Sequence, residues 1–414
     1  MRTRRDRKFQ LWDMLSQFVF LGGALAANLP LTTDANCNCY RTNATTSNYF
    51  AHHLFFDFRN LPQYARVPPL IGDPDGNTQA AVASSYFSLP QWTSYWAAQN
   101  WNNSEMMRMN NSDLSGSDAT VLMVNSPNNV YVDRDRDPRP ASQTHLVMRT
   151  ARLAAGFQTV AEIESVSTGF RFLSIRMLAR TRGPPGAITA MFTYRPPAGP
   201  LPVQEADLEI RTRDPENAVQ YTNQPSWNAD GDIPAATRNT TMPRGSRWTG
   251  WAHYRLDWTP YLSTWYVNGQ FASSIAFQAP RDPAQVILNS WSDGGSWSGN
   301  MTANATAAMQ IQWIEMVFNN TDPVYTKFGS CKNVCSIDET HVVGTPVLMP
   351  SGGDIPLSSL PRLVAATYDI WDIEAAILVQ QYVKDHEATF EIKKVPPDSD
   401  HRSPSEVSVC RHYA

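Results

Sequence analysis

The middle of the chain alternates apolar and polar residues with a period of two. Successive side chains of a strand point to opposite faces, so this alternation predicts strands that each bury one face. The segments are short, rich in β-branched and aromatic residues, and separated by Pro, Gly, Asn and Asp. They span 50–59, 120–124, 145–153, 159–165, 169–180, 187–194, 203–211, 219–223, 252–258, 263–267, 271–277, 286–291 and 309–318. We therefore predict an all-β sandwich.

One predicted strand, 203–211, carries three acids on a single face. Glu205, Asp207 and Glu209 alternate there with apolar residues. Neighbouring like charges repel one another, so the arrangement is costly unless its chemistry needs one acid protonated while another is ionised. Glycoside hydrolysis has this need, because one carboxylate attacks the anomeric carbon of the sugar and a protonated one delivers a proton to the leaving oxygen. Taken alone, the motif also fits a solvated acidic strand.

The acidic strand and three later segments together resemble glycoside hydrolase family 16. The strand motif of this family is Glu-(Ile/Leu/Val)-Asp-x-Glu, and the later similarities follow in order at 251–260, 264–269 and 288–299. The resemblance covers about residues 50–320. It implies a concanavalin A-like jelly roll whose concave sheet holds the substrate cleft.

The resemblance also implies a role for each acid. Glu205 would be the nucleophile, Glu209 the general acid/base, and Asp207 the residue that orients and tunes the nucleophile. We expect a raised pKa for Glu209, because burial and two charged neighbours disfavour a third charge. Ala206 stands where the family usually has a larger aliphatic residue, a difference that concerns core packing. The motif lacks an extra residue after Asp207, and this unbulged form is similar to lichenases, xyloglucan transglycosylases and fungal chitin-glucan crosslinking enzymes.

Further residues are expected to line the cleft around the acids. Aromatic rings stack on the apolar faces of sugars, while amides and hydroxyls bind the sugar hydroxyls. By the same resemblance, Tyr221 and Asn223 form a polar pair that faces the acids. The full set of expected substrate-binding residues is Tyr221, Asn223, Trp227, Asn289, Trp291 and Trp297.

These features predict a secreted retaining endo-β-glucanase that cleaves β-1,3 or mixed β-1,3/1,4-glucan by double displacement. A cell-wall transglycosylase that crosslinks glucan, or chitin with glucan, would form the same glycosyl-enzyme and differ only in the acceptor. A catalytically silent, lectin-like glucan-binding protein and a structural wall protein are alternatives of another class. The sequence leaves the glucan linkage open.

The N-terminus and the sequons both indicate secretion. A basic head at 2–8 and an apolar run at 18–27 predict a signal peptide over 1–27, and the run is too short to cross a bilayer. A buried N-terminal helix is the alternative. Asn-x-Ser/Thr sequons predict N-glycosylation at Asn43, Asn102, Asn110, Asn239, Asn300, Asn304 and Asn319. We expect an extracellular or cell-wall location.

Four cysteines lie in two pairs at the two ends of the predicted sandwich. These pairs are Cys37 with Cys39 and Cys331 with Cys335. We interpret them as two disulfides that join the beginning of the domain to its end, because no histidine lies at the spacing of a zinc site. A local bond between Cys331 and Cys335 is an alternative, and Cys410 has no evident mate.

Composition excludes some partners. The net charge is only −4, and no basic run with interleaved aromatic residues indicates nucleic-acid binding. We expect a polysaccharide substrate, a monomer, no membrane span in the mature chain, no cofactor and no catalytic metal; a structural calcium ion is left open. The sandwich domain is assigned to 28–345. The extension 346–414 begins with a Pro/Gly/Ser linker and continues as a short helix and a disordered tail.

Overall fold

The computed structural model describes residues 29–42, 48–77, 80–109, 118–325 and 330–350. Several sequence predictions lie outside these residues and stay predictions. They concern the signal peptide, the sequons at Asn43 and Asn110, Cys410, and the part of the extension beyond residue 350.

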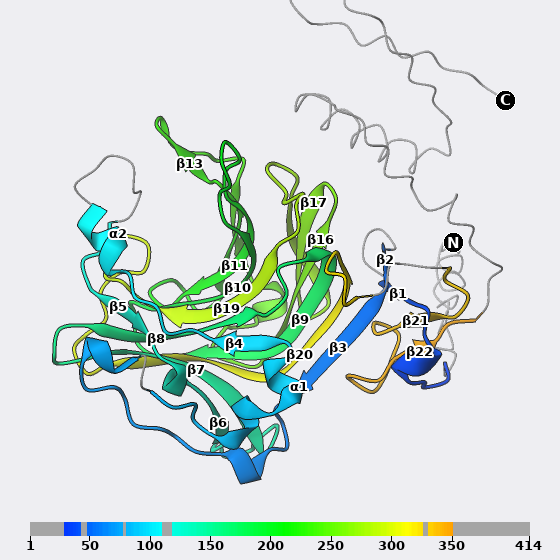
Figure 1. Cartoon of the computed structure of the whole chain (residues 1–414), viewed down its shortest axis with the longest axis horizontal. Coiled ribbons are helices and arrows are strands. Elements are labelled where there is room, and N and C mark those ends of the chain that lie inside the picture. Colours follow the sequence, from blue (N-terminus) through cyan, green and yellow to red (C-terminus); the bar gives the residue numbers. More distant parts are fainter. Residues whose placement is uncertain (1–28, 43–47, 78–79, 110–117, 326–329, 351–414) are drawn as a thin grey trace, which may run out of the picture. The chain divides into compact units, whose positions relative to one another are not determined.

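Two β-sheets pack face to face in the described part of the chain (Figure 1). The first, here called the acid sheet, has the strand order β15 (Thr237–Thr241), β12 (Ala218–Gln224), β11 (Gln204–Arg211), β10 (Ile188–Arg195), β19 (Gln285–Trp291) and β8 (Gln158–Ser165), with β4 (Trp96–Ala98) beside β8. The second, the opposite sheet, has the order β7 (Thr144–Arg152), β20 (Thr306–Asn320), β9 (Phe170–Arg182), β16 (Ala252–Thr259), β17 (Leu262–Val267) and β18 (Gln270–Ile275). A hairpin between β7 and β8 joins the two sheets.

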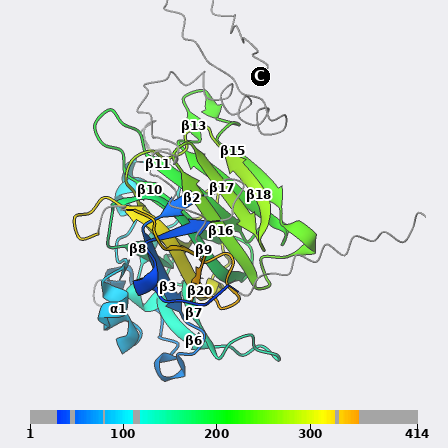
Figure 2. The same ribbon diagram turned by 90° about the vertical axis from the view of Figure 1, so that its right-hand side faces the viewer.

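Shorter elements extend these sheets. β3 (His52–Asp57) pairs with β20, β5 (Met123–Asn125) with β8, and β6 (Val130–Arg134) with β7, while β13 (Trp227–Asn228) and β14 (Gly231–Asp232) form a separate hairpin. The α-helices are α1 (Pro90–Thr93) and α2 (Ser104–Met109). Single turns of 3-10 helix lie at Asp34–Asn36, Pro62–Tyr64, Pro74–Asn77, Ser85–Ser88, Pro127–Asn129 and Pro243–Gly245. Figure 2 shows β18 at the edge of the opposite sheet, next to β15, which it contacts.

The core lies between the two sheets. Leu208 of β11, Tyr221 of β12 and Trp265 of β17 are fully or almost fully buried within one continuous apolar cluster. Burying each large apolar side chain stabilises the fold by about 1.5–3 kcal/mol. The apolar positions on each strand face this layer, so alternate residues of the acid sheet must face outward.

The predicted all-β jelly-roll sandwich is confirmed. Each predicted strand overlaps an observed one, usually to within a few residues. The predicted strand 50–59 is divided at Ala51 into β2 (Asn48–Phe50) and β3. The sequence patterns missed most strands of two to four residues, which give too little alternation to detect, and also β6 and β15, which have five residues each.

A small third sheet joins the beginning of the described domain to its end. It has the order β2, β1 (Cys39–Thr42), β21 (Val334–Ser336) and β22 (Val347–Leu348), and we call it the terminal clasp (Figure 1). Disulfides link Cys37 to Cys335 and Cys39 to Cys331, with Cα–Cα distances of 5.7 and 5.4 Å. The two-disulfide interpretation is therefore confirmed, and the local alternative is wrong. The clasp packs on the outer face of the opposite sheet, where a second apolar cluster includes Val317.

Candidate active site

The three acids lie on the outer face of β11, in the middle of the acid sheet. Ala206 and Leu208 point the other way into the core and are 0% and 1% exposed. On the outer face, Asp207 is buried, while Glu205 and Glu209 are half-buried. The alternation expected from the sequence therefore sets the three side chains on one surface.

The pairing register sets each acid in a row of residues that crosses the sheet. The row of Glu209 contains Gln220, Ala190, Asn289 and Glu162. The row of Asp207 contains Thr222, Phe192, Ile287 and Glu164. The row of Glu205 contains Gln224, Tyr194 and Gln285. The outer face thus combines carboxyls with amides and with two aromatic rings, the groups that bind sugars.

The surroundings of the acids raise their pKa values. Burial, followed by the charge of Glu205, raises the pKa of Glu209 to about 7, which confirms the predicted direction. Burial also raises the pKa of Glu205 to about 7, and a hydrogen bond with Asp207 opposes this rise. Burial and the charges of Glu205 and Glu209 raise the pKa of Asp207 well above its ordinary value. The three carboxyls therefore titrate as a coupled group that still holds protons near neutral pH.

Two neighbouring side chains donate hydrogen bonds to the acids. Gln224 donates from Nε2 to Oδ2 of Asp207 at 3.4 Å, across the β11–β12 pair. Trp297 donates from its indole Nε1 to Oε2 of Glu209 at 2.9 Å, from the loop after β19. The sequence predicted that Trp297 lines the substrate cleft, and the structure shows it in direct contact with Glu209.

Three other predicted substrate-binding residues lie on accessible or outward positions. Asn289 and Trp291 share the outer face of β19, and Asn289 donates from Nδ2 to Oε2 of Glu162 at 3.3 Å. Trp227 lies in the β13–β14 hairpin and is 49% exposed. This hairpin follows β12 directly after Gln224, the residue paired with Glu205.

The prediction that Tyr221 and Asn223 face the acids is wrong. They pair with Leu208 and Ala206, so they share the inward face of the sheet, and both are 0% exposed. The ring of Tyr221 packs against Trp265 at 5.1 Å. The amide of Asn223 donates to the backbone oxygens of Ile275 and Phe277. The residues of β12 that do share the face of the acids are Gln220, Thr222 and Gln224.

A second carboxyl pair on the same face was missed from the sequence. Glu162 and Glu164 lie on β8, three strands from β11 and roughly 14 Å away at about 4.8 Å per strand. Trp101 donates from Nε1 to Oε1 of Glu162 at 2.8 Å, and burial raises the pKa of Glu162 to about 7. Glu164 accepts a hydrogen bond from Gln285 at 3.1 Å. The signal was available, since two acids two residues apart on a predicted strand must share a face.

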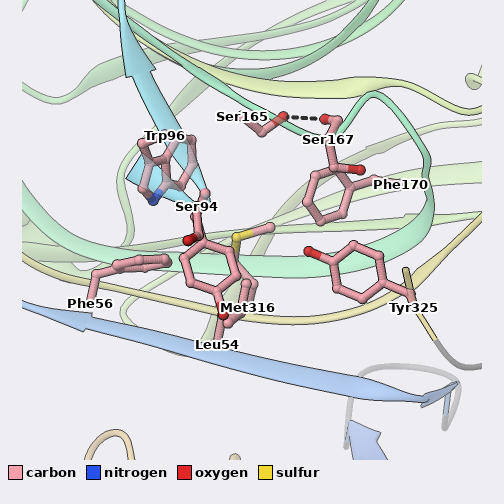
Figure 3. A pocket seen from close by; sticks show the side chains of 10 residues that line it. Leu54, Phe56, Ser94, Trp96, Ser165, Ser167, Phe170, Met316 and Tyr325 are labelled. Carbon is pink, nitrogen blue, oxygen red and sulfur yellow. Dashed lines mark hydrogen bonds between the residues drawn. The ribbon is translucent and has the colours of Figure 1, made fainter. Parts of the chain in front are cut away.

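A separate pocket lies elsewhere in the sandwich (Figure 3). Its walls come from β3, β4, β20 and the ends of β8 and β9, and include Phe56, Trp96 and Tyr325. No carboxylate lines it, and none of its residues belongs to β10, β11 or β19. It therefore does not form part of the acidic surface. The described residues also contain no cluster of three or more His, Cys, Asp or Glu side chains suited to hold a metal ion.

Within the described part of the chain, none of the helices has the length and apolar character needed to cross a membrane.

Comparison with known proteins identifies the sequence relatives of this domain. Residues 118–315 match the family described as "Glycosyl hydrolases family 16". A beta-glucanase of Bacillus licheniformis is 26% identical over 131 residues, which cover 31% of this chain and 51% of that protein. The Crh-like protein 3 of Botryotinia fuckeliana is 24% identical over 194 residues, which cover 44% of this chain and 41% of that protein. The chain thus spans only about half the length of these relatives.

Solved structures align with this chain at lower identity. The structure of a Bacillus licheniformis beta-glucanase aligns with a TM-score of 0.40 and 20% identity, over 54% of this chain and 92% of that one.

Proposed function

Residues 118–315 belong to glycoside hydrolase family 16, and we propose that the protein is a secreted retaining endo-β-glucanase. One observation carries the proposal: Glu205, Asp207 and Glu209 share the outer face of one strand, and the first and last have pKa values near 7. Beta-glucanases among the relatives support a β-glucan as the substrate, and we propose a β-1,3 or mixed β-1,3/1,4-glucan.

In the first step, the carboxylate of Glu205 attacks the anomeric carbon as the bond to the leaving oxygen breaks. Protonated Glu209 gives its proton to that oxygen, and a covalent glycosyl-enzyme ester forms on Glu205. In the second step, ionised Glu209 takes a proton from water, which attacks the anomeric carbon and releases Glu205. Both acids are regenerated in their initial protonation states.

Asp207 can account for the different protonation states of Glu205 and Glu209. Its pKa is raised well above the ordinary value, so it holds a proton that it can donate in a hydrogen bond to Glu205. This bond opposes the effect of burial on the pKa of Glu205 and favours its ionised form. The coupled group thus keeps a nucleophile charged while an acid four residues along the strand stays neutral.

Rescue with azide tests the two assignments. We expect Glu205→Ala and Glu209→Ala each to lose turnover of a dinitrophenyl β-oligoglucoside at the natural rate. Azide should restore turnover in both, because the small anion replaces the missing carboxylate. Its product with Glu205→Ala should be the α-glycosyl azide, and with Glu209→Ala the β-glycosyl azide, as NMR can show. Glu216→Gln, which changes an exposed acid paired with Arg247, is the matched control and should behave as the wild type.

A set of defined glucans then identifies the substrate. Oligosaccharides with β-1,3 or mixed linkages, incubated with a labelled acceptor sugar, report linkage and acceptor together. Label in the polymer would indicate transglycosylation, and label that stays in the acceptor would indicate hydrolysis. Binding to glucan without any product would contradict the enzymatic proposal.

We also propose that the protein is extracellular or bound to the cell wall. The two disulfides that close the clasp support this, because such bonds persist in oxidising compartments. Among the described sequons, Asn102, Asn239, Asn300 and Asn304 are exposed, whereas Asn319 is half-buried and accepts a hydrogen bond from the backbone of Ala51. Mass spectrometry of the secreted protein should therefore find glycans at the four exposed sites in preference to Asn319.

A further inference from the structure

The residue that follows the three acids on the outer face of β11 is a cation. Arg211 lies two residues beyond Glu209, so its side chain emerges on the same surface. It is 17% exposed, and its Nε donates to Oδ2 of Asp214 at 2.8 Å. This ion pair fixes the guanidinium beside Glu209 instead of leaving it free in solvent.

The guanidinium of Arg211 stacks on the ring of Trp297. The Cζ atom lies 4.4 Å from the ring centroid, within the range of a cation–π contact. The N–H at the edge of the same indole ring donates to Oε2 of Glu209. Arg211, Trp297 and Glu209 therefore form a continuous chain of contacts that ends on the expected acid/base.

Trp297 needs this support because its own segment is a loop. Its loop, 292–299, is held by Asp293, whose Oδ1 accepts from the N–H of Gly295 and from the hydroxyl of Ser298. Gly294 adopts a φ of +72°, which a side chain would disfavour. These bonds fix the backbone of the loop. The orientation of the indole ring depends instead on Arg211, which covers one face of the ring.

The indole N–H has a specific effect on Glu209 because it can only donate. An oxygen that accepts this bond cannot at the same time present a proton toward it. Oε2 is thus held as an acceptor. Because the carbonyl oxygen of a neutral carboxyl is the stronger acceptor, the hydrogen bond favours the proton of neutral Glu209 on Oε1. We propose that Arg211 is a positioning residue of the reaction: by stacking on Trp297 it holds the indole N–H on Oε2 and so directs proton delivery through Oε1.

The charge of Arg211 adds a second effect of the same contact. Burial and the charge of Glu205 raise the pKa of Glu209. The hydrogen bond from Trp297 and the charge of Arg211 lower it. Among the other groups facing Glu209 from its neighbours, Glu205 is a like charge, and none is a cation. They are Asp207 and Glu205 on β11, Gln220 on β12, Ala190 on β10, Asn289 on β19 and, beyond Asn289, Glu162 on β8. Arg211 is the cation of this set, so its removal should make Glu209 harder to ionise.

The leaving group of the substrate distinguishes this role from a merely structural one. This inference rests on the proposed function. Departure of an alcohol or sugar needs the proton of Glu209, whereas dinitrophenolate leaves without it. For Arg211→Met and Trp297→Phe, we expect kcat/KM on oligoglucosides with an alcohol leaving group to fall about 10- to 100-fold, and kcat/KM on the dinitrophenyl substrate, which reports only formation of the glycosyl-enzyme, to change less than about 3-fold.

The pH profile supplies the second readout. Both variants should shift the alkaline limb of kcat to higher pH, because ionised Glu209 loses a stabilising neighbour. Arg211→Lys keeps the charge but not the planar stack. Its alkaline limb should therefore lie close to that of the wild type, while its activity on the alcohol leaving group should still fall more than its activity on the dinitrophenyl substrate. The double variant should cost no more than the larger single change, since Arg211 acts through Trp297. Arg247→Met, which removes an exposed cation, is the matched control.

Three outcomes would overturn the inference. They are an equal loss on both substrates, an unshifted alkaline limb, and additive effects in the double variant. If Arg211→Met does not fold, Trp297→Phe alone decides through the same two readouts. Failure of the proposed function would look different, because the wild-type protein would then turn over neither substrate.

Discussion

Two groups of acids occupy opposite outer faces of the sandwich, and their surroundings differ. Beneath the terminal clasp, Glu315 is 0% exposed and accepts from Nε of Arg176 at 2.9 Å, while Nε2 of His53 lies 3.0 Å from its other oxygen. Asp34 and Asp338 complete this cluster through His53 and Arg176. On β11, by contrast, none of the ion pairs found among the described residues includes Glu205, Asp207 or Glu209.

The difference appears in the direction of the pKa shifts. Burial alone would raise the pKa of Glu315, but the hydrogen bonds and charges of His53 and Arg176 outweigh it, and the pKa is lowered. The acids on β11 lack such partners, and their pKa values rise. Paired acids therefore stabilise the attachment of the clasp, whereas unpaired acids retain the protons that acid/base chemistry needs.

The largest effect is expected on the unpaired side, in activity. Glu205→Gln keeps the size of the side chain but removes the nucleophile. We expect turnover of a dinitrophenyl oligoglucoside to fall by about 10⁴-fold or more, equivalent to about 5.4 kcal/mol at 1.36 kcal/mol per decade. Steady-state kinetics measures this. Retained turnover would exclude Glu205 as the nucleophile.

On the paired side, the expected effect is on stability. Glu315→Gln leaves Arg176 and His53 buried without their shared carboxylate. The free energy of unfolding at pH 7 should fall by about 3 kcal/mol, with activity per folded molecule unchanged, because breaking a buried pair exposes an uncompensated charge. Chemical denaturation measures the loss. A change as small as that of the exposed pair in Glu216→Gln, expected within about 0.5 kcal/mol, would show that the cluster contributes little.

The disulfides of the clasp should matter somewhat less. Cys37→Ser together with Cys335→Ser removes one of the two links, each of which closes a loop of nearly the whole domain. The expected loss is about 2–3 kcal/mol in the free energy of unfolding, since the second link still restricts the unfolded chain. Denaturation with and without reductant tests this, and reductant should affect the variant less than the wild type. Equal sensitivity of both proteins would argue against the prediction.

The smallest effect is a loss of stability with rising pH, which both sides should show in different pH ranges. A raised carboxyl pKa favours folding only while the group is protonated, so the wild type should lose stability as pH rises through about 7, and Glu205→Gln should lose less, because only Asp207 and Glu209 still titrate there. The variant should exceed the wild type by about 1 kcal/mol at pH 8 and match it at pH 5.

Replacing His53 should destabilise the protein, whereas replacing Glu205 should stabilise it at high pH. Its carboxylate partners outweigh burial and raise its pKa to about 9, so its contribution is present below pH 6.5 and is lost as pH rises through about 9. His53→Gln should therefore be less stable than the wild type at pH 6, and the gap should narrow above pH 9. Thermal unfolding across this range measures both variants, and parallel curves would contradict the assignment.

The sequence predicted what depends on local alternation and missed what depends on register. The period of two in β11 was sufficient to set three acids on one face, because that property belongs to a single strand. Whether Tyr221 or Thr222 faces these acids depends on the connection between β11 and β12, which local pattern does not determine. The same limit hid the position of Glu162 relative to Glu209, which depends on two intervening strands, although the shared face of Glu162 and Glu164 was visible in the sequence.

The clasp shows a different limit. Its strands are too short to detect, and β1 pairs in parallel with β21 from the far end of the domain. The cysteine pairs nevertheless predicted that these ends meet, because covalent chemistry leaves a sequence signal where strand pairing does not. Arg211 was also missed, since one cation after three acids becomes informative only when Trp297 is placed against it.

The hydrogen bond from the N–H of Leu348 to the oxygen of Pro30 has a practical consequence. It places the first and last described segments side by side, on the face of the sandwich away from Glu205 and Glu209. A short peptide joining these positions would allow circular permutation, with new ends opened in the exposed β13–β14 hairpin. The same adjacency means that a surface tether attached at either position would leave the acidic surface pointing toward a polymer in solution.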